Sequence, residues 1–199
     1  MITDLPNLLT LSRIIAIPVL VLLVALCHPA TDAAACVLFI LAGITDYFDG
    51  HLARSRQLQS DLGRMLDPIA DKLLVGASLM VLAGTDRMVF GALWPAIVIL
   101  CREILVSGLR EYLATTKVSL PVTRLAKWKT GFQMTAIGFL LAGDSTAGLI
   151  GLPALPIGLT GSVLLWIAAI LTLITGWDYV LTGLRHVEQA PRGARTGSR

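Results

Sequence analysis

Long apolar runs alternate with short polar stretches along the chain. The runs cover about residues 7–26, 33–54, 63–83, 88–114, 122–141 and 157–184. Each is long enough for a helix that crosses a bilayer. The second run is apolar only from Ala33 to Ile44, about 12 residues, and it reaches a spanning length only if it continues through the charged residues 46–54. We therefore predict six transmembrane helices, and we expect the charged residues that end the second helix to lie inside or at the edge of the membrane.

Short polar segments are predicted to connect these helices. They are the turn at His28–Asp32, the polar turn at residues 55–62, the turn at Gly84–Arg87, the loop at Thr115–Pro121 and the Gly- and Pro-rich loop at Asp144–Pro156. After the sixth run, the basic stretch 185–199 is expected to be disordered. The chain is thus divided into a six-helix domain, residues 1–184, and a tail, residues 185–199.

Basic residues concentrate on one side of the predicted spans. The connections after the first, third and fifth runs contain one basic residue, Arg87, whereas the other connections and the tail contain many. Positive charge favours the cytoplasmic side of a membrane. Both termini are therefore expected in the cytoplasm, in agreement with an even number of spans.

The composition agrees with an all-α membrane protein of one domain. Of the 199 residues, 55% are hydrophobic and 15% are charged, whereas a soluble domain carries about 25% charged residues. The net charge of +3 does not form the basic stripe of a nucleic-acid-binding protein, so no nucleic-acid partner is expected. The excess indicates orientation in the membrane and anionic lipid or phosphate ligands.

Four aspartates between the second and third runs have helical spacing. Asp46 and Asp49 are three residues apart, and Asp67 and Asp71 are four apart. Each pair therefore lies on one face of its helix, and the turn between the helices brings the pairs together. Carboxylates beside hydrocarbon are unfavourable, and hard divalent cations take oxygen ligands. The spacing predicts a metal site with four carboxylates.

These aspartates belong to a longer pattern, Asp46-x2-Asp49-Gly50-x2-Ala53-Arg54-x8-Gly63-x3-Asp67-x3-Asp71. The pattern resembles the signature of the CDP-alcohol phosphatidyltransferases at all eight fixed positions. Salt bridges with Arg54, Arg64 and Lys72 are the simpler explanation for any one pair of aspartates. They do not explain both glycines and the spacing.

The resemblance implies a six-helix membrane enzyme with the CDP-alcohol phosphotransferase fold, commonly a homodimer, in a bacterial inner membrane with its active site facing the cytoplasm. Such an enzyme transfers a phosphatidyl-type group from a CDP-linked lipid to an alcohol and releases CMP. Two Mg²⁺ or Mn²⁺ ions would be held by Asp46, Asp49, Asp67 and Asp71, and Asp71 would be the general base. The CDP-lipid would be bound by Asn7, Thr10, Asp46, Gly50, Ala53, Arg54 and Gly63.

The chemistry of the donor agrees with these roles. The negative charge of a diphosphate must be neutralised before a hydroxyl attacks it, which two metal ions can do. A carboxylate within hydrogen-bond reach can take the proton of the alcohol. Arg54 can add a bidentate contact to the diphosphate, and Gly50 and Gly63 permit close approach.

Three further segments narrow the acceptor. Residues 6–23, 102–114 and 124–134 resemble the bacterial phosphatidylglycerophosphate synthases, a branch of the same family. This resemblance implies CDP-diacylglycerol as donor and sn-glycerol 3-phosphate as acceptor. A phosphomonoester needs cationic partners, and the candidates are Arg102, Arg110, Arg124 and Lys127. Lys117 and Lys129 are equally consistent with membrane anchoring, and Glu103 and Glu111 with orienting the arginines.

Other functions remain open at this point. The same chemistry would serve with serine, inositol phosphate or phosphatidylglycerol as acceptor. An intramembrane prenyltransferase also binds diphosphates through aspartates, although usually in two motifs on separated helices of longer chains. A transporter would need charged residues along a path through the membrane, whereas here they gather on one side.

Overall fold

The computed structural model describes residues 5–56, 61–115, 124–149, 151 and 155–189. Within these ranges, the side chains of residues 5–7, 47–56, 61–62, 64, 115, 149, 178 and 182–189 are not described. The described residues form six α-helices: α1 (Leu5–Ala25), α2 (Pro29–Arg56), α3 (Asp61–Gly84), α4 (Leu93–Thr115), α5 (Arg124–Leu149) and α6 (Ile157–Gln189). The prediction of an all-α protein with six helices is thus confirmed.

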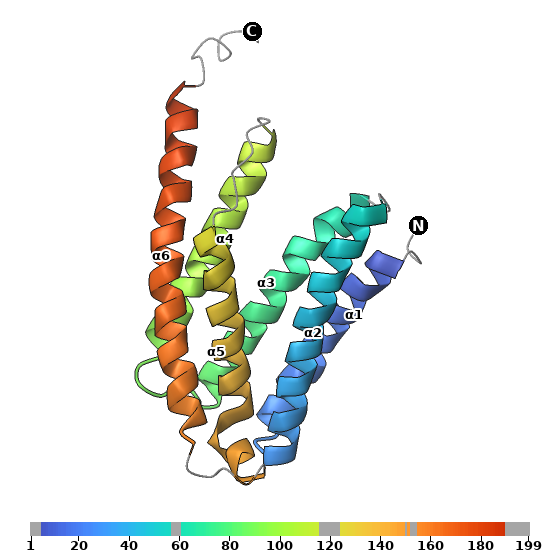
Figure 1. The fold of residues 1–199 in the computed structure, drawn as a ribbon, viewed down its shortest axis with the longest axis vertical. Coiled ribbons are helices and arrows are strands. Elements are labelled where there is room, and N and C mark those ends of the chain that lie inside the picture. Colours follow the sequence, from blue (N-terminus) through green and yellow to red (C-terminus); the bar gives the residue numbers. More distant parts are fainter. Residues whose placement is uncertain (1–4, 57–60, 116–123, 150, 152–154, 190–199) are drawn as a thin grey trace, which may run out of the picture.

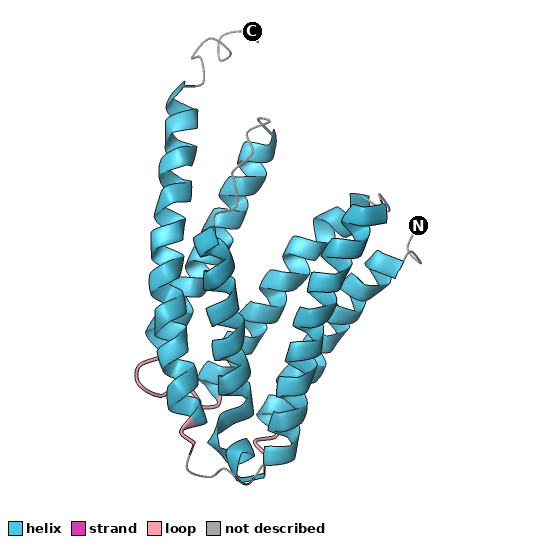
Figure 2. Cartoon of the chain, viewed as in Figure 1, coloured by secondary structure: helices cyan, strands magenta, loops and turns pink. Residues whose placement is uncertain are grey.

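The helices form two groups of three that diverge toward one end of the molecule (Figure 1). In the first group α1 packs on α2 and α3, and in the second α6 packs on α4 and α5. The groups are joined mainly where α2 packs on α5. The start of α1 and the end of α6 lie at the open end (Figure 1), whereas the described loops lie at the end where the groups converge (Figure 2).

Three helices of the described chain are long and apolar enough to cross a membrane. The apolar windows are Leu8–Ala25 in α1, Pro29–Asp46 in α2 and Ile157–Leu181 in α6. The outer faces of these helices are apolar as well, with Ile15 and Leu173 among the exposed large residues. Helices that are apolar all round are typical of a lipid environment. Helices α3, α4 and α5 have charged residues in their halves near the open end, and six spans stay a prediction.

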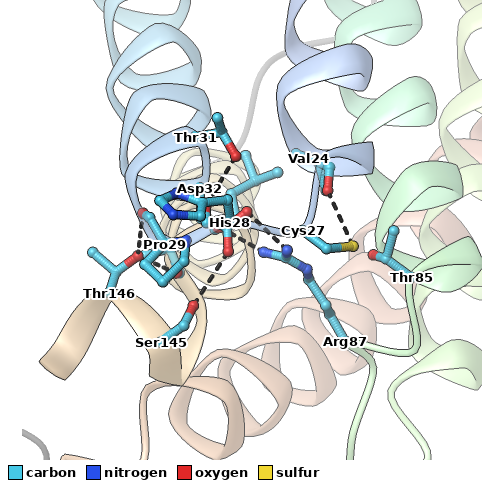
Figure 3. Close-up of polar contacts among 12 residues, drawn as sticks. Val24, Cys27, His28, Pro29, Thr31, Asp32, Thr85, Arg87, Ser145 and Thr146 are labelled. Carbon is cyan, nitrogen blue, oxygen red and sulfur yellow. Dashed lines mark hydrogen bonds and ion pairs between the residues drawn. The ribbon is translucent and has the colours of Figure 1, made fainter. Parts of the chain in front are cut away.

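A buried polar cluster ties the two groups together at the convergent end (Figure 3). Asp32, in the first turn of α2, is 2% exposed. It accepts hydrogen bonds from Arg87 Nη2 at 2.8 Å and from Ser145 Oγ at 3.2 Å. Arg87 Nη1 also donates to the carbonyl of Leu141 at 3.2 Å. One carboxylate therefore contacts both the loop between α3 and α4 and the end of α5.

The boundaries around this cluster differ from the prediction. The sequence places a turn at His28–Asp32, but α2 begins at Pro29. Proline is favoured in the first turn of a helix, and an acidic residue there is stabilised by the helix dipole. The fourth run is predicted to be helical from Met88, but α4 begins at Leu93. Phe90 and Gly91 precede it with φ of 55° and 65°, which a helix cannot contain.

The ends of α5 and α6 also lie beyond the predicted positions. The sequence places a loop at Asp144–Pro156, but α5 continues to Leu149 after a break at Gly143, where φ is 64° and ψ is 169°. Asp144 then accepts a hydrogen bond from the backbone of Gly158 at 2.8 Å, which caps the start of α6. Helix α6 continues to Gln189, past residue 184. Residues 190–199 of the predicted tail lie outside the described residues.

Candidate active site

Two carboxylates of the motif converge on a buried arginine of α1. Arg13 is 2% exposed. Its Nη1 donates to Asp46 Oδ1 of α2, and its Nη2 lies 3.6 Å from Asp67 Oδ1 of α3. Thr10 lies one turn before Arg13 and donates its hydroxyl hydrogen bond to Asp67. Asp46 and Asp67 therefore contact the same arginine, and α1 supplies the groups that hold them, while their role as metal ligands stays a prediction.

Sequence reasoning missed the role of Arg13. A signal was present, because an arginine in an otherwise apolar helix needs a partner. The identity of that partner was not readable, since Arg13 reaches residues 33 and 54 positions away in the chain. Thr10, by contrast, was predicted to bind the CDP-lipid; it contacts Asp67, and its part in lipid binding stays a prediction.

The carboxylates at this site are suitable ligands for a hard divalent cation. Asp46 and Asp67 offer carboxylate oxygens from two helices, and Asp71 follows Asp67 by one turn of α3. Among the described side chains, no group of three or more His, Cys, Asp or Glu residues lies together as a complete metal site. The fourth aspartate, Asp49, belongs to the last turns of α2, whose side chains are not described. The carboxylates present would supply part of a ligand set.

Several other predicted residues fall on the same undescribed side chains. Asn7 lies in the first turn of α1, and Gly50, Ala53 and Arg54 lie in the last turns of α2. Their backbones are helical, and their contacts lie outside the described part of the chain. Gly63 is buried in the first turn of α3.

A cavity of about 770 Å³ opens beside Asp71, between α3, α4, α5 and α6. Its lining includes Arg102 and Arg110 of α4 and Lys127 of α5. Three of the four cations proposed for the acceptor phosphate thus face the same space as Asp71. Arg124, the fourth, is exposed at the start of α5 and does not line this cavity.

Helix α6 orients the two arginines of α4. The guanidinium carbons of Arg102 and Arg110 lie 5.7 and 5.6 Å from the centroid of the Tyr179 ring. This is the distance of a cation–π interaction. Arg102 Nη2 also donates to Thr175 Oγ1 at 3.0 Å. A β-carbon on Gly176 would lie 3.1 Å from Arg102 Cγ, so a larger residue there would push against the arginine.

A second ion pair borders the cavity. Lys129 of α5 is buried, and its ammonium group donates a hydrogen bond to Glu103 Oε1 of α4. The same carboxylate oxygen accepts a hydrogen bond from Arg102 Nη1 at 3.3 Å. Glu103 therefore orients Arg102, which is the role that the sequence analysis suggested for it. Of the two roles left open for Lys129, the burial and this ion pair favour a place in the site over membrane anchoring. The described side chain of Glu111 is exposed.

A second cavity, of about 550 Å³, lies between α1, α3, α4 and α5. Its walls are mostly apolar and include Ile17, Leu73 and Leu100. Asp71, Glu103 and Lys129 line both cavities. The charged space and the apolar space therefore meet at Asp71.

Comparison with known proteins adds independent information. Residues 3–174 match the family described as CDP-alcohol phosphatidyltransferase. A protein of Rickettsia typhi named CDP-diacylglycerol–glycerol-3-phosphate 3-phosphatidyltransferase is 48% identical over 88% of this chain and 94% of its own length. Proteins of the same name from Cereibacter sphaeroides and Bacillus subtilis are 40% and 35% identical, over 93% and 88% of this chain and 97% and 93% of their own lengths.

Proposed function

The chain belongs to the CDP-alcohol phosphatidyltransferase family, and we propose that it transfers the phosphatidyl group of CDP-diacylglycerol to sn-glycerol 3-phosphate. The products are phosphatidylglycerophosphate and CMP. The observation that carries this proposal is the cavity that joins Asp71 to Arg102, Arg110 and Lys127. A carboxylate that can take a proton and cations that can bind a phosphate share one space, as a phosphorylated alcohol requires. The names of the relatives support the same reaction.

The acceptor enters with its phosphate toward the cations. Arg110 and Lys127 bind the phosphate oxygens, and Arg102 is held in place by Thr175 and Tyr179. Arginine presents a fixed fork of donors to phosphate, and its stacking on Tyr179 limits its freedom before the ligand arrives. The hydroxyl at the other end of the acceptor then lies toward Asp71.

Asp71 acts as the general base. Its carboxylate takes the proton of the acceptor hydroxyl while the hydroxyl oxygen bonds to the phosphatidyl phosphorus. The bond from that phosphorus to the CMP oxygen breaks, and CMP leaves with the electron pair. Glu103 and Lys129 border this space as a neutral pair, so they add no net charge beside Asp71.

Asp46, Asp49, Asp67 and Asp71 would hold two divalent cations, Mg²⁺ or Mn²⁺. When bound, these cations would neutralise the diphosphate of the donor. The chain itself orients two of the ligands, because Thr10 and Arg13 fix Asp67 and Asp46 from α1. Asn7, Gly50, Ala53, Arg54 and Gly63 complete the proposed CDP-lipid site on the same ends of α1, α2 and α3.

The protein is a membrane protein with helical spans. We place both termini and the open end of the helix groups on the cytoplasmic side of a bacterial inner membrane, with all six helices spanning it and two copies forming a homodimer. Native Cys27, exposed beside the convergent end, tests the orientation. A membrane-impermeant maleimide should label it in intact spheroplasts, and labelling only in inverted vesicles would reverse the topology. Cross-linking in native membranes tests the dimer.

Turnover with a panel of acceptors tests the reaction. Protein purified in detergent is assayed for CMP release from CDP-diacylglycerol with glycerol 3-phosphate, serine, inositol phosphate or phosphatidylglycerol, with and without EDTA. We expect turnover with glycerol 3-phosphate alone, lost in EDTA and restored by Mg²⁺ or Mn²⁺. Turnover with another acceptor and not with glycerol 3-phosphate would refute the assignment.

A further inference from the structure

A third cavity lies between α2 and α5, which pack side by side (Figure 1). Its volume is about 590 Å³, and its walls are mostly apolar, with Phe39 and Ile40 from α2 and Phe139 from α5. Ile40 and Ile44, which also line it, are 49% and 46% exposed, so the cavity is open on the outer side of α2. Both residues belong to the apolar window Pro29–Asp46, which is long enough to cross a membrane. This cavity, the α2–α5 groove, therefore opens toward lipid.

The groove lies where the acyl chains of a donor bound at Asp46 would extend. Ile44, at one end of its α2 wall, precedes Asp46 by two residues, and Cys36, at the other end, precedes it by ten. At about 1.5 Å of rise per residue, the wall reaches about 15 Å below the level of Asp46. This is the depth of one leaflet of a bilayer whose hydrocarbon core is about 30 Å thick. The groove runs from Asp46 toward the convergent end, which is the direction of the membrane interior when the open end is cytoplasmic.

Met134 connects the groove to the catalytic cavities. It lines the groove, the charged cavity and the apolar cavity of about 550 Å³. A flexible methionine side chain can adapt to a ligand that lies against it. Two apolar spaces of similar volume thus adjoin the space that holds Asp71. A diacylglycerol has two acyl chains, so there is one space for each.

Two glycines keep the groove open. A β-carbon on Gly43 would lie 3.1 Å from Met134 Cε, whereas one on Gly138 would meet nothing within 4 Å outside the backbone of its own helix. Gly138 therefore borders empty space in the groove. Its carbonyl accepts a hydrogen bond from the thiol of Cys36 at 3.4 Å, which places Gly138 at the deep end. Lipid and the groove are equally apolar, so the shape of the groove, and not transfer out of water, decides what binds.

We infer that the α2–α5 groove holds one acyl chain of the CDP-linked donor, and that Gly138 leaves the space that a long chain needs at the deep end. This inference rests on the proposed function, which places the donor diphosphate at the aspartates of α2 and α3. The second chain would lie in the apolar cavity of about 550 Å³. Bulk membrane lipid has the same chains but lacks the diphosphate that holds the donor at the start of the groove. The donor is therefore the occupant that the site retains.

Competition between donors of two chain lengths tests the inference. The chains of dioctanoyl CDP-diacylglycerol end before the level of Gly138, whereas those of the dioleoyl donor pass it. Gly138→Leu fills the deep end, so the ratio of kcat/KM for the dioleoyl donor to that for the dioctanoyl donor should fall about 10-fold from the wild-type value. Both donors compete in one micelle preparation, so loss of folded protein and donor partitioning cancel. Gly148→Leu, on an exposed glycine of α5 that does not line any of the three cavities, should leave the ratio unchanged.

Photolabelling tests occupancy without turnover. CDP-diacylglycerol with a diazirine near the end of one chain should label the parts of α2 and α5 around Cys36 and Gly138, and unlabelled CDP-diacylglycerol should compete. Phosphatidylcholine with the same diazirine-bearing chain should label them less. Equal labelling by phosphatidylcholine would overturn the inference, because bulk lipid would then fill the groove. An unchanged ratio in Gly138→Leu, or an equal fall in Gly148→Leu, would also overturn it. If the donor labels the groove but glycerol 3-phosphate supports no turnover, the proposed function fails and the acyl-chain site stands.

Discussion

Arg13 is a buried cation between two carboxylates that the family's chemistry assigns to metal ions. Its guanidinium offsets the repulsion between Asp46 and Asp67, whose side chains remain 46% and 40% exposed. Because both carboxylates reach solvent, the interaction is screened and its contribution is modest. The arginine therefore holds the two helices together when no metal ion is bound, and it supports a preformed site.

Substitution of Arg13 should make the protein more dependent on divalent metal. In EDTA, Arg13→Gln should lower the midpoint of thermal unfolding by about 2–6 °C, because about 1–2 kcal/mol of ion-pair stabilisation is lost. Added Mg²⁺ should raise the midpoint more in the variant than in the wild type, since a cation then replaces the missing charge. Arg124→Gln, on an exposed residue outside the cavity, is the control. Equal shifts on adding Mg²⁺ would show that Arg13 does not offset the carboxylates.

Asp71 is the residue on which turnover should depend most. Asp71→Asn keeps the size of the side chain but cannot take the proton of the acceptor, so kcat should fall at least about 100-fold. Binding of CDP-diacylglycerol, measured by titration calorimetry in the presence of Mg²⁺, should largely persist. Asp86→Asn, an exposed residue at the convergent end, should behave as wild type. Near wild-type kcat in Asp71→Asn would remove the general-base role.

Arg110 should act on the acceptor rather than on the donor. Arg110→Ala removes a charged donor from the cavity, so KM for glycerol 3-phosphate should rise about 10- to 100-fold while KM for CDP-diacylglycerol changes little. Arg124→Ala removes the same charge from a residue that does not line the cavity, and it should leave both constants nearly unchanged. An equal rise in both constants for Arg110→Ala would indicate a structural arginine.

At the scale of the elements, the sequence predicted more than it missed. Apolar runs located all six helices, because their length and the polar turns between them are local properties. The motif spacing predicted that the two pairs of aspartates approach one another, and Asp46 and Asp67 both contact Arg13. The orienting groups Thr175 and Tyr179 were not predictable, because they lie in α6, where the sequence resembled the family only in being apolar. Their role depends on how α6 packs on α4, which no local pattern encodes.

Helix α5 shows how one residue can mislead such a prediction. The Gly- and Pro-rich stretch Asp144–Pro156 indicated a loop, but α5 continues to Leu149, and within α5 only Gly143 leaves the helical conformation. Its φ of 64° is disfavoured for residues with a β-carbon. The break lets Asp144 reach the start of α6 and brings the carbonyl of Leu141 to Arg87. A local departure from helical geometry therefore serves two contacts between elements.

A pair of glycines in α5 tests this interpretation. Gly143→Ala should destabilise the protein by about 1 kcal/mol, seen as a midpoint of thermal unfolding lower by about 2–4 °C, because alanine resists positive φ. Gly148→Ala should be neutral or slightly stabilising, since Gly148 is helical and a β-carbon there would meet nothing within 4 Å. If both variants melt alike, the conformation at Gly143 is not required for stability.

At the scale of the whole molecule, the two helix groups separate at the end that holds the site and are fastened at the other (Figure 1). The cavities lie where the groups face one another, with Asp71 contributed by the first group and Arg102, Arg110 and Lys127 by the second. The relative position of the groups therefore sets the distance between the base and the phosphate-binding cations. The contacts between Asp32, Arg87 and Ser145 are part of what fixes that position (Figure 3).

Loss of the contacts between Asp32 and Arg87 should lower the stability of the protein and should also affect the site at the open end. Arg87→Met leaves Asp32 buried without its ion-pair partner, so stability should fall by about 3–5 kcal/mol. The double variant Asp32→Asn with Arg87→Met removes both charges, and its midpoint of thermal unfolding should lie above that of the single variant. At temperatures where Arg87→Met is folded, kcat/KM should fall for both substrates together, because the groups move relative to one another. A selective change in KM for glycerol 3-phosphate would contradict this, since Arg87 lies at the opposite end from the cations that bind the acceptor.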